Sequence, residues 1–305
     1  MSRPTVLAVA LVLVWSSGFL AADLGAGGAA GQTLLTWRCL VLALLLAPFL
    51  PRPSSRLGAR VWVEQAVLAL LCQCLYLTGI YWAAAAGVPA GTSALIASMQ
   101  PAVVLLATAV LYRRAWTRGH VWGVLAGTAG VAVTAAGDLG AGATAQALAL
   151  PFLAMGALAA GTVLHESWRA RPAPVLPLRQ SLALQSVFTA GFTAAMSVAG
   201  GDLLPPPVPA FWVAVALAVA AGLGSYAAYY RAIDVLGADR TNALLYLTPA
   251  VTAVGATLIG GEALRVSTAL GLALGGLGAG LLLRQGSFRS RPASVGGACA
   301  DDVGR

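Results

Sequence analysis

The chain of 305 residues contains no lysine and has little charge of either sign. Only 9% of its residues are charged, whereas 59% are hydrophobic and the mean hydropathy is +0.84. Soluble domains average about 25% charged residues. A chain with so few charged side chains cannot solvate a globular surface of this size. The composition therefore excludes a soluble protein and indicates one that lies in a membrane.

The residue types that usually carry catalysis or bind metals are also scarce. The sequence has two histidines and four cysteines, and Cys39, Cys72, Cys74 and Cys299 lack the spacing of a metal site or a disulfide framework. No apolar run holds a pair of carboxylates or a histidine with ligand partners, and the loops are too short for a catalytic domain. We therefore expect no enzymatic activity, no metal and no cofactor.

Apolar runs long enough to cross a bilayer fill most of the chain. The ten candidates lie near residues 5–25, 34–50, 66–86, 92–112, 118–137, 146–165, 180–199, 209–230, 241–261 and 266–284. The first run is longer than the core of a signal peptide, so we interpret it as a retained helix. The weak alternation of a transmembrane barrel is absent. The pattern predicts an all-α integral membrane protein with ten transmembrane helices.

The 18 arginines are distributed unevenly along the chain. All but two of them lie at the N-terminus, in every second loop, or from residue 284 onward. Loops rich in basic residues stay in the cytoplasm, so we expect both termini there, in the inner (cytoplasmic) cell membrane. Because this placement accounts for nearly all of the net charge of +8, we expect no nucleic-acid partner.

The sequence repeats itself at an offset of 148 residues. Pro101-Ala102-Val103 aligns with Pro249-Ala250-Val251, and the glycines at 123, 127 and 130 align with those at 271, 275 and 278. This indicates a five-helix unit duplicated as residues 1–140 and 146–285, followed by a disordered cytoplasmic tail at 286–305. Because five is odd, the second copy would enter the membrane inverted. The loop charges agree, since the basic YRRAWTRG becomes GGEALRVS in the second copy.

The two aligned prolines interrupt otherwise apolar runs. Symmetry-related interrupted helices are the best sequence indication of a midplane site in a transporter, so we interpret Pro101 and Pro249 as hinge or kink positions at that site. The alternative is that both are packing kinks. The glycines recur at helical spacing on one face, and we interpret them as helix-packing positions; they are Gly123, Gly127, Gly130, Gly271, Gly275 and Gly278.

Several segments resemble the EamA-type members of the drug/metabolite transporter superfamily. They are VWSSGFLAAD, LLTWRCLVLALLL, GVPAGTSALIASMQP and LGADRTNALLYLTP, and the resemblance covers residues 5–285. The glycine-glutamate pair that usually follows the fourth helix survives only as Gly261-Glu262, because Tyr112-Arg113-Arg114 stands in the first copy. The resemblance implies ten helices around a central cavity, alternating access, and efflux of small metabolites or drugs.

Aromatic and neutral polar residues lie on the helices that this family places around its cavity. The cavity candidates are Trp15, Ser16, Phe19, Tyr76, Gln100, Gln185, Tyr226 and Tyr246, with Asn242 as a further polar group. A large, apolar and sparsely polar lining is typical of small-molecule sites. The alternative for the tyrosines is an interfacial belt, which suits Tyr81, Tyr229 and Tyr230 best.

Arg38 completes the candidates as the only arginine clearly inside a span, about one turn from the outer end of its predicted helix. An intramembrane charge is a candidate functional residue. Three interpretations remain open: Arg38 binds a carboxylate of the substrate, pairs with Asp23, or extends to the interface.

These patterns favour a transporter that exports small amphiphilic metabolites, amino-acid-like or drug-like, by alternating access through a central cavity. The alternative is a polytopic membrane scaffold or accessory subunit without transport activity. The expected partners are the lipid bilayer and a small-molecule substrate, and a homodimer stays open.

Overall fold

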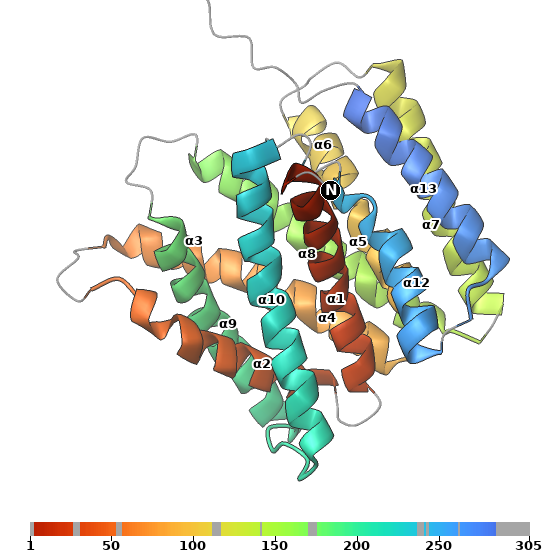
Figure 1. Ribbon diagram of the computed structural model, residues 1–305. Helices are drawn as coiled ribbons and strands as arrows, with labels where there is room; N and C mark the ends of the chain where they lie inside the picture. The colour runs from red at the N-terminus through yellow and green to blue at the C-terminus, as the bar shows by residue number, and fades with distance from the viewer. Residues whose placement is uncertain are drawn as a thin grey trace, which may run out of the picture.

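The computed structural model describes residues 3–26, 31–52, 57–111, 117–140, 142–169, 176–236, 241, 244–261 and 263–284. Within these ranges all regular structure is helical (Figure 1). The elements are α1 (Arg3–Ala26), α2 (Gly31–Leu46), η1 (Ala47–Phe49), α3 (Ala59–Leu68), η2 (Ala69–Leu75), α4 (Tyr76–Ala85), α5 (Ala90–Ser98), α6 (Gln100–Leu111), α7 (Arg118–Gly140), α8 (Ala145–Arg169), α9 (Leu178–Gly200), α10 (Pro209–Leu236), α12 (Thr248–Gly260) and α13 (Val266–Arg284). The expected all-α class is confirmed.

Seven helical segments are long and apolar enough to cross a membrane. They are Pro4–Leu24, Gly31–Phe49, Ala59–Ala85, Arg118–Gly140, Ala145–His165, Leu178–Gly200 and Pro209–Tyr229. Three more apolar helices, Ala90–Val104, Thr248–Ile259 and Val266–Leu282, are shorter. Each predicted span overlaps one of these ten segments. Seven spans rather than ten reach the length of a full crossing within the described residues, and the predicted tail at 286–305 lies outside them.

The third segment begins earlier than its hydropathy suggests and is internally irregular. Helix runs without interruption from Ala59 to Ala85, and η2 in its middle is a π-helix. Such π turns are rare and frequently occur at functional sites. Gly161 of α8 lies against η2, where an added Cβ would collide with Sγ of Cys72. A side chain at position 161 would therefore separate α8 from this turn.

Both aligned prolines follow a break in the helix. Helix α5 ends at Ser98, and Pro101 is the second residue of α6. Pro249 is likewise the second residue of α12, which begins after a turn at residues 246–247. Proline is well accommodated in the first turn of a helix, where its missing N–H would have no intrahelical partner. The chain thus bends just before each proline and resumes as a helix with the proline in its first turn.

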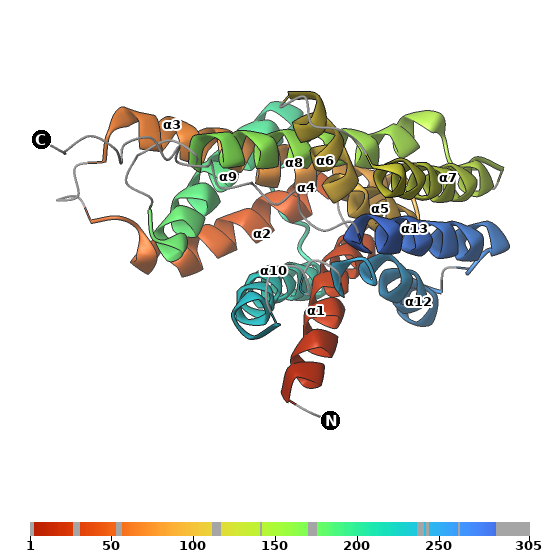
Figure 2. The ribbon, with the colours of Figure 1, turned by 90° about the horizontal axis from the view of Figure 1, so that it is seen from above.

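Helix packing follows the repeat. Helix α7 packs along α13, its counterpart at the 148-residue offset, and α5 packs against α12, which is the counterpart of α6. Figures 1 and 2 show α7 and α13 side by side at one edge of the bundle. Helix α2 packs against α9, which also correspond. The contact of α1 with α10 has its counterpart in the contact of α8 with α4. Exchanging the two halves of the chain therefore leaves the main set of contacts unchanged.

The α7–α13 contact depends on the six glycines named above. A Cβ added at Gly130 would lie 2.6 Å from the carbonyl oxygen of Gly271, and one at Gly278 would lie 2.6 Å from that of Gly123. Helix backbones approach this closely only where no side chain stands between them. Gly127 instead accommodates the side chain of Met99, which directly follows α5, and Gly275 that of Leu95 in α5.

Candidate functional site

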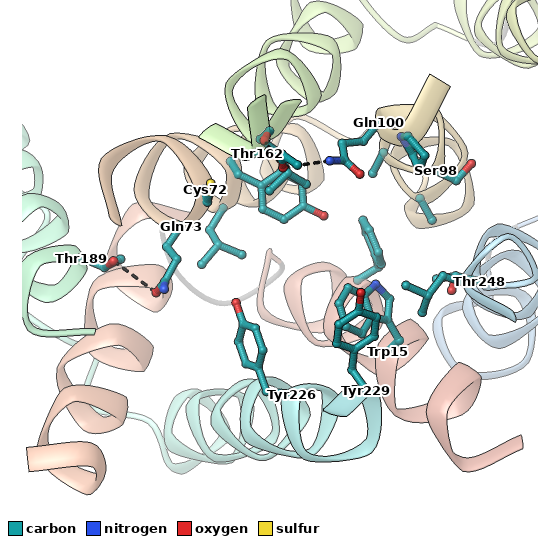
Figure 3. A pocket seen from close by; sticks show the side chains of 18 of the residues that line it. Trp15, Cys72, Gln73, Ser98, Gln100, Thr162, Thr189, Tyr226, Tyr229 and Thr248 are labelled. Carbon is teal, nitrogen blue, oxygen red and sulfur yellow. Dashed lines mark hydrogen bonds between the residues drawn. The ribbon is translucent and has the colours of Figure 1, made fainter. Parts of the chain in front are cut away.

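A cavity of about 480 Å³ lies in the middle of the bundle. Residues from both halves of the chain line it, and Figure 3 shows Tyr226 and Tyr229 extending into it from α10, opposite Gln100 and Thr162. The lining residues include Trp15, Phe19, Arg38, Cys72, Gln73, Tyr76, Ser98, Gln100, Pro101, Leu158, Thr162, His165, Ser186, Thr189, Tyr226, Tyr229, Leu245, Tyr246 and Thr248. A volume of this size suits a small molecule.

The cavity lies nearer one face of the molecule. We define the N-face as the end of the bundle where α1 begins and where α6, α8 and α10 end, which is the upper side of Figure 1. The lining residues of α8 and α10, such as Thr162, His165 and Tyr229, come from the second half of each helix. Leu245 and Tyr246 come just before α12 begins. The cavity therefore extends from the middle of the bundle toward the N-face.

Seven of the nine residues proposed for the cavity line it, and two do not. Trp15, Phe19, Arg38, Tyr76, Gln100, Tyr226 and Tyr246 line it, as does Pro101. Ser16 is instead buried, and its hydroxyl donates to the carbonyl of Thr248 at 3.3 Å. Pro249 is not among the lining residues, although its neighbour Thr248 is. Asn242 lies outside the described residues.

Gln185 lies behind the cavity wall and is hydrogen-bonded to Gln73, a lining residue that was not predicted from the sequence. The Gln73 side chain donates to Oε1 of Gln185 at 2.9 Å. It also accepts a hydrogen bond from the Thr189 hydroxyl at 3.3 Å (Figure 3). Gln185 in turn donates to Oε1 of Gln65 at 2.8 Å, and the Ser181 hydroxyl donates to the same oxygen at 2.6 Å. This chain of hydrogen bonds joins α3 and η2 to α9 and fixes the amide of Gln73 at the cavity.

The aromatic residues form one side of the cavity. The rings of Trp15 and Tyr229 lie 5.6 Å apart at an interplanar angle of 49°. Tyr229 therefore belongs to the lining rather than to an interfacial belt. Tyr81 is 2% exposed within the core, a position that also differs from the interfacial belt given as the alternative. The side chain of Tyr230 lies outside the described residues.

Arg38 lies deeper than predicted. Because α2 begins at Gly31 rather than at residue 34, Arg38 is about two turns from the start of the helix. Its side chain is buried, with 9% exposed, and does not extend to an interface. Its Nε donates to the carbonyl of Ala218 at 3.2 Å, and the guanidinium carbon lies 5.7 Å from the centre of the Tyr81 ring. Among the contacts of the described residues, the ion pair with Asp23, one of the three open interpretations, is absent.

Polar contacts tie the helix ends together at the face opposite the cavity. The Asp138 carboxylate, 1% exposed, accepts from the Thr92 hydroxyl at 2.6 Å and pairs with Arg265 Nη1 at 3.1 Å. This joins α7, α5 and the segment before α13. On α2, the Trp37 indole donates to the carbonyl of Leu203 at 2.9 Å and the Thr33 hydroxyl to that of Asp202 at 2.7 Å. We call the group formed by Thr92, Asp138 and Arg265 the clasp.

The side chains of the site are mostly apolar or neutral. Within the described ranges no group of three or more histidine, cysteine or acidic side chains is placed to hold a metal ion. The cavity residues described above carry aromatic, aliphatic, thiol, amide and hydroxyl groups, together with one arginine and one histidine. Such a set can enclose an apolar body, donate hydrogen bonds and bind an anion.

Comparisons with known proteins agree with this architecture. The model of the EamA-like transporter family matches residues 3–136 and 148–284, once for each half of the chain. A solved structure titled "Crystal structure of protein" superposes with a TM-score of 0.58 at 21% identity, over 93% of this chain and 99% of the other. No protein of curated function matches the chain. Because the family model covers both halves, the chain belongs to the EamA-like transporter family, whose members are polytopic helical membrane transporters rather than enzymes.

Proposed function

We propose that the protein exports small amphiphilic molecules from the cytoplasm by alternating access through the central cavity. The observation that carries this proposal is a cavity of about 480 Å³ lined by residues from both halves of the chain. A scaffold has no need of a hollow lined by hydroxyl and amide groups at the middle of the bundle. Family membership makes transport the general expectation, and the cavity supplies a site for it.

The proposed topology is ten helices in two inverted repeats, with both termini in the cytoplasm. The uneven arginine distribution supports this orientation, and the exchange of helix contacts between the two halves supports the repeat. In this orientation the N-face is cytoplasmic. The cavity then extends toward the cytoplasm, whereas the clasp and the Trp37 and Thr33 bonds close the external side. The structure would thus represent an inward-facing state.

Export would require the two sides to open in turn. Breaking the clasp opens the external side, and bending at the two proline breaks closes the cytoplasmic side around the bound molecule. Both breaks lie at the cavity wall. The first spans Ser98 to Pro101 and the second Leu245 to Thr248, and each stretch contains residues that line the cavity. The movement therefore changes the wall of the site itself.

The proposal is tested by counterflow in proteoliposomes together with cysteine labelling. Cys39, Cys72, Cys74 and Cys299 are replaced first, because Cys72 lines the cavity. Single cysteines at positions 100, 226 and 246 should then react with a membrane-impermeant reagent. Ala183→Cys is the matched control, since Ala183 is 0% exposed within the core. Labelling at none of the three positions, with no counterflow, would support a packed scaffold instead.

A further inference from the structure

Arg38 carries a buried positive charge, and no carboxylate of the described residues pairs with it. Its Nε donates a hydrogen bond to the Ala218 carbonyl and the neutral Tyr81 side chain contacts its guanidinium, while Nη1 is buried without a partner. An unpaired charge inside a membrane protein is costly, so the residues that carry one usually face a partner or a water-filled cavity. The guanidinium has such a position, because Arg38 lines both the central cavity and an adjoining one of about 110 Å³.

The surrounding helices hold the guanidinium in this position. A Cβ added at Gly222 would lie 3.0 Å from Nη2, so the glycine leaves room for the arginine one turn beyond Ala218 on α10. The ring of Tyr81 from α4 lies on its other side, 5.7 Å from the guanidinium carbon. Three helices thus contribute to one arginine position, and none of these contacts neutralises the charge.

The charge balance of the lining is one-sided. Of the described residues that line the two cavities, none is an aspartate or a glutamate. A cationic substrate would find no counter-charge there and would lie near the charge of Arg38. An anionic group would neutralise that charge and would gain charge-assisted hydrogen bonds from the guanidinium.

Resting on the proposed function, we infer that the transported molecule carries a carboxylate bound by Arg38. Its apolar part would lie against the aromatic side formed by Trp15, Phe19 and Tyr229. Any further polar groups would face the amides of Gln73 and Gln100. The substrate class is therefore small organic acids and amino acids with an apolar body, and simple cationic amphiphiles are excluded.

Two probe series that differ only in charge test this inference. The first is phenylalanine, 3-phenylpropionate and phenethylamine, and the second is leucine, 4-methylpentanoate and isopentylamine. In each series one probe has both charges, one only the carboxylate and one only the ammonium group. Binding to the full-length protein in detergent is measured by ligand-induced thermal stabilisation, and transport is measured separately in proteoliposomes. The carboxylate-bearing probes should bind and the amines should not.

Variants of Arg38 identify the residue responsible. Arg38→Gln should weaken binding of the carboxylate-bearing probes about 30-fold, the equivalent of about 2 kcal/mol for a hydrogen bond to a charged group. Gly222→Ala should give a smaller loss of the same kind, because it crowds the guanidinium and keeps its charge. Gly222→Ala also tests the assignment if the Arg38→Gln variant does not fold. Arg60→Gln removes an exposed arginine paired with Glu64 and should leave binding unchanged.

The outcomes separate the inference from the proposed function. Amines that bind as tightly as the acids, or acids whose affinity is unaffected by both Arg38→Gln and Gly222→Ala, would overturn the carboxylate assignment even if transport occurs. Probes that bind with the expected charge preference but do not cross the proteoliposome membrane would leave the assignment intact and contradict export. Binding of none of the six probes would also overturn the carboxylate assignment.

Discussion

The clasp predicts an unequal effect of removing its two charges. Asp138 is 1% exposed, whereas the Arg265 side chain is 40% exposed. Arg265→Gln leaves a buried carboxylate whose remaining partner is the Thr92 hydroxyl at 2.6 Å. Removing one partner of a buried ion pair costs about 3–5 kcal/mol. Because solvent reaches the arginine side of this pair and screens it, we expect a cost below that range, about 2–3 kcal/mol.

Asp138→Asn should be milder, although it removes the same ion pair. The uncharged side chain still accepts the Thr92 hydrogen bond through its amide oxygen, and the released Arg265 turns into water. The expected loss is about 1 kcal/mol, the net value of an ordinary hydrogen bond. The double variant should be about as stable as Asp138→Asn alone, because the arginine has little effect once the carboxylate is neutral.

Thermal unfolding in detergent at one scan rate measures the order of these variants. Membrane proteins often unfold irreversibly, so the ranking of the midpoints is more informative than a converted free energy. Arg60→Gln is the control, since its pair with Glu64 is exposed and such pairs contribute about 0–1 kcal/mol. A midpoint for Asp138→Asn at or below that of Arg265→Gln would refute the reasoning about burial.

Three further predictions concern the prolines, the glycines and the topology. Pro101→Ala and Pro249→Ala should change the free energy of unfolding by less than about 1 kcal/mol, because each proline already lies in a first helical turn. Counterflow should fall in both variants, and unchanged counterflow would mean that the prolines are packing kinks. Gly130→Ala should overpack α7 against α13, destabilise the protein by about 1–3 kcal/mol and so lower the unfolding midpoint. Gly156→Ala, with open space at its Cβ position, should leave the midpoint unchanged. Equal midpoints for the two variants would contradict the role of Gly130 in this contact. Reporter fusions at residues 57 and 175 should read cytoplasmic and those at 30 and 205 external, and a cytoplasmic reading at 205 would contradict the inverted repeat.

The helices were predictable because the length of each apolar run can be read directly from the sequence. Hydropathy identified the segments that became α1, α7 and α13 to within a few residues. It placed the start of the third segment at residue 66 rather than at Ala59, because Arg60 and Glu64 make the first turns look polar. The π-helix η2, which packs against α8 and α9, gave no signal in the sequence.

The cavity was less predictable because its wall is assembled from distant segments. Tyr226 and Gln100 stood out as polar or aromatic residues in apolar runs, and both line it. Gln73 carried the same signal and was missed, while Gln185 was assigned to the cavity although it lies one hydrogen bond behind it. Which of two neighbouring glutamines faces the hollow depends on the rotation of two helices about their axes, and one sequence does not specify that rotation.

The electrostatic role of Arg38 could not be predicted from the sequence either. Its place within an apolar run indicated a special role, and three interpretations remained open on sequence alone. The contacts with Ala218, Tyr81 and Gly222 involve residues more than forty positions away, so no local pattern could select among them. The choice required the packing of α2 against α10 and α4.

Alternating access through one cavity is the central claim, and two-sided labelling at position 226 tests it most directly. A single cysteine there, in a background without the native cysteines, is exposed to a membrane-impermeant reagent in right-side-out and in inside-out vesicles. The account predicts fast labelling from the cytoplasmic side and slower but measurable labelling from the external side, which speeds up when Arg265→Gln weakens the clasp. Labelling from the cytoplasmic side alone, unchanged by Arg265→Gln, would contradict it.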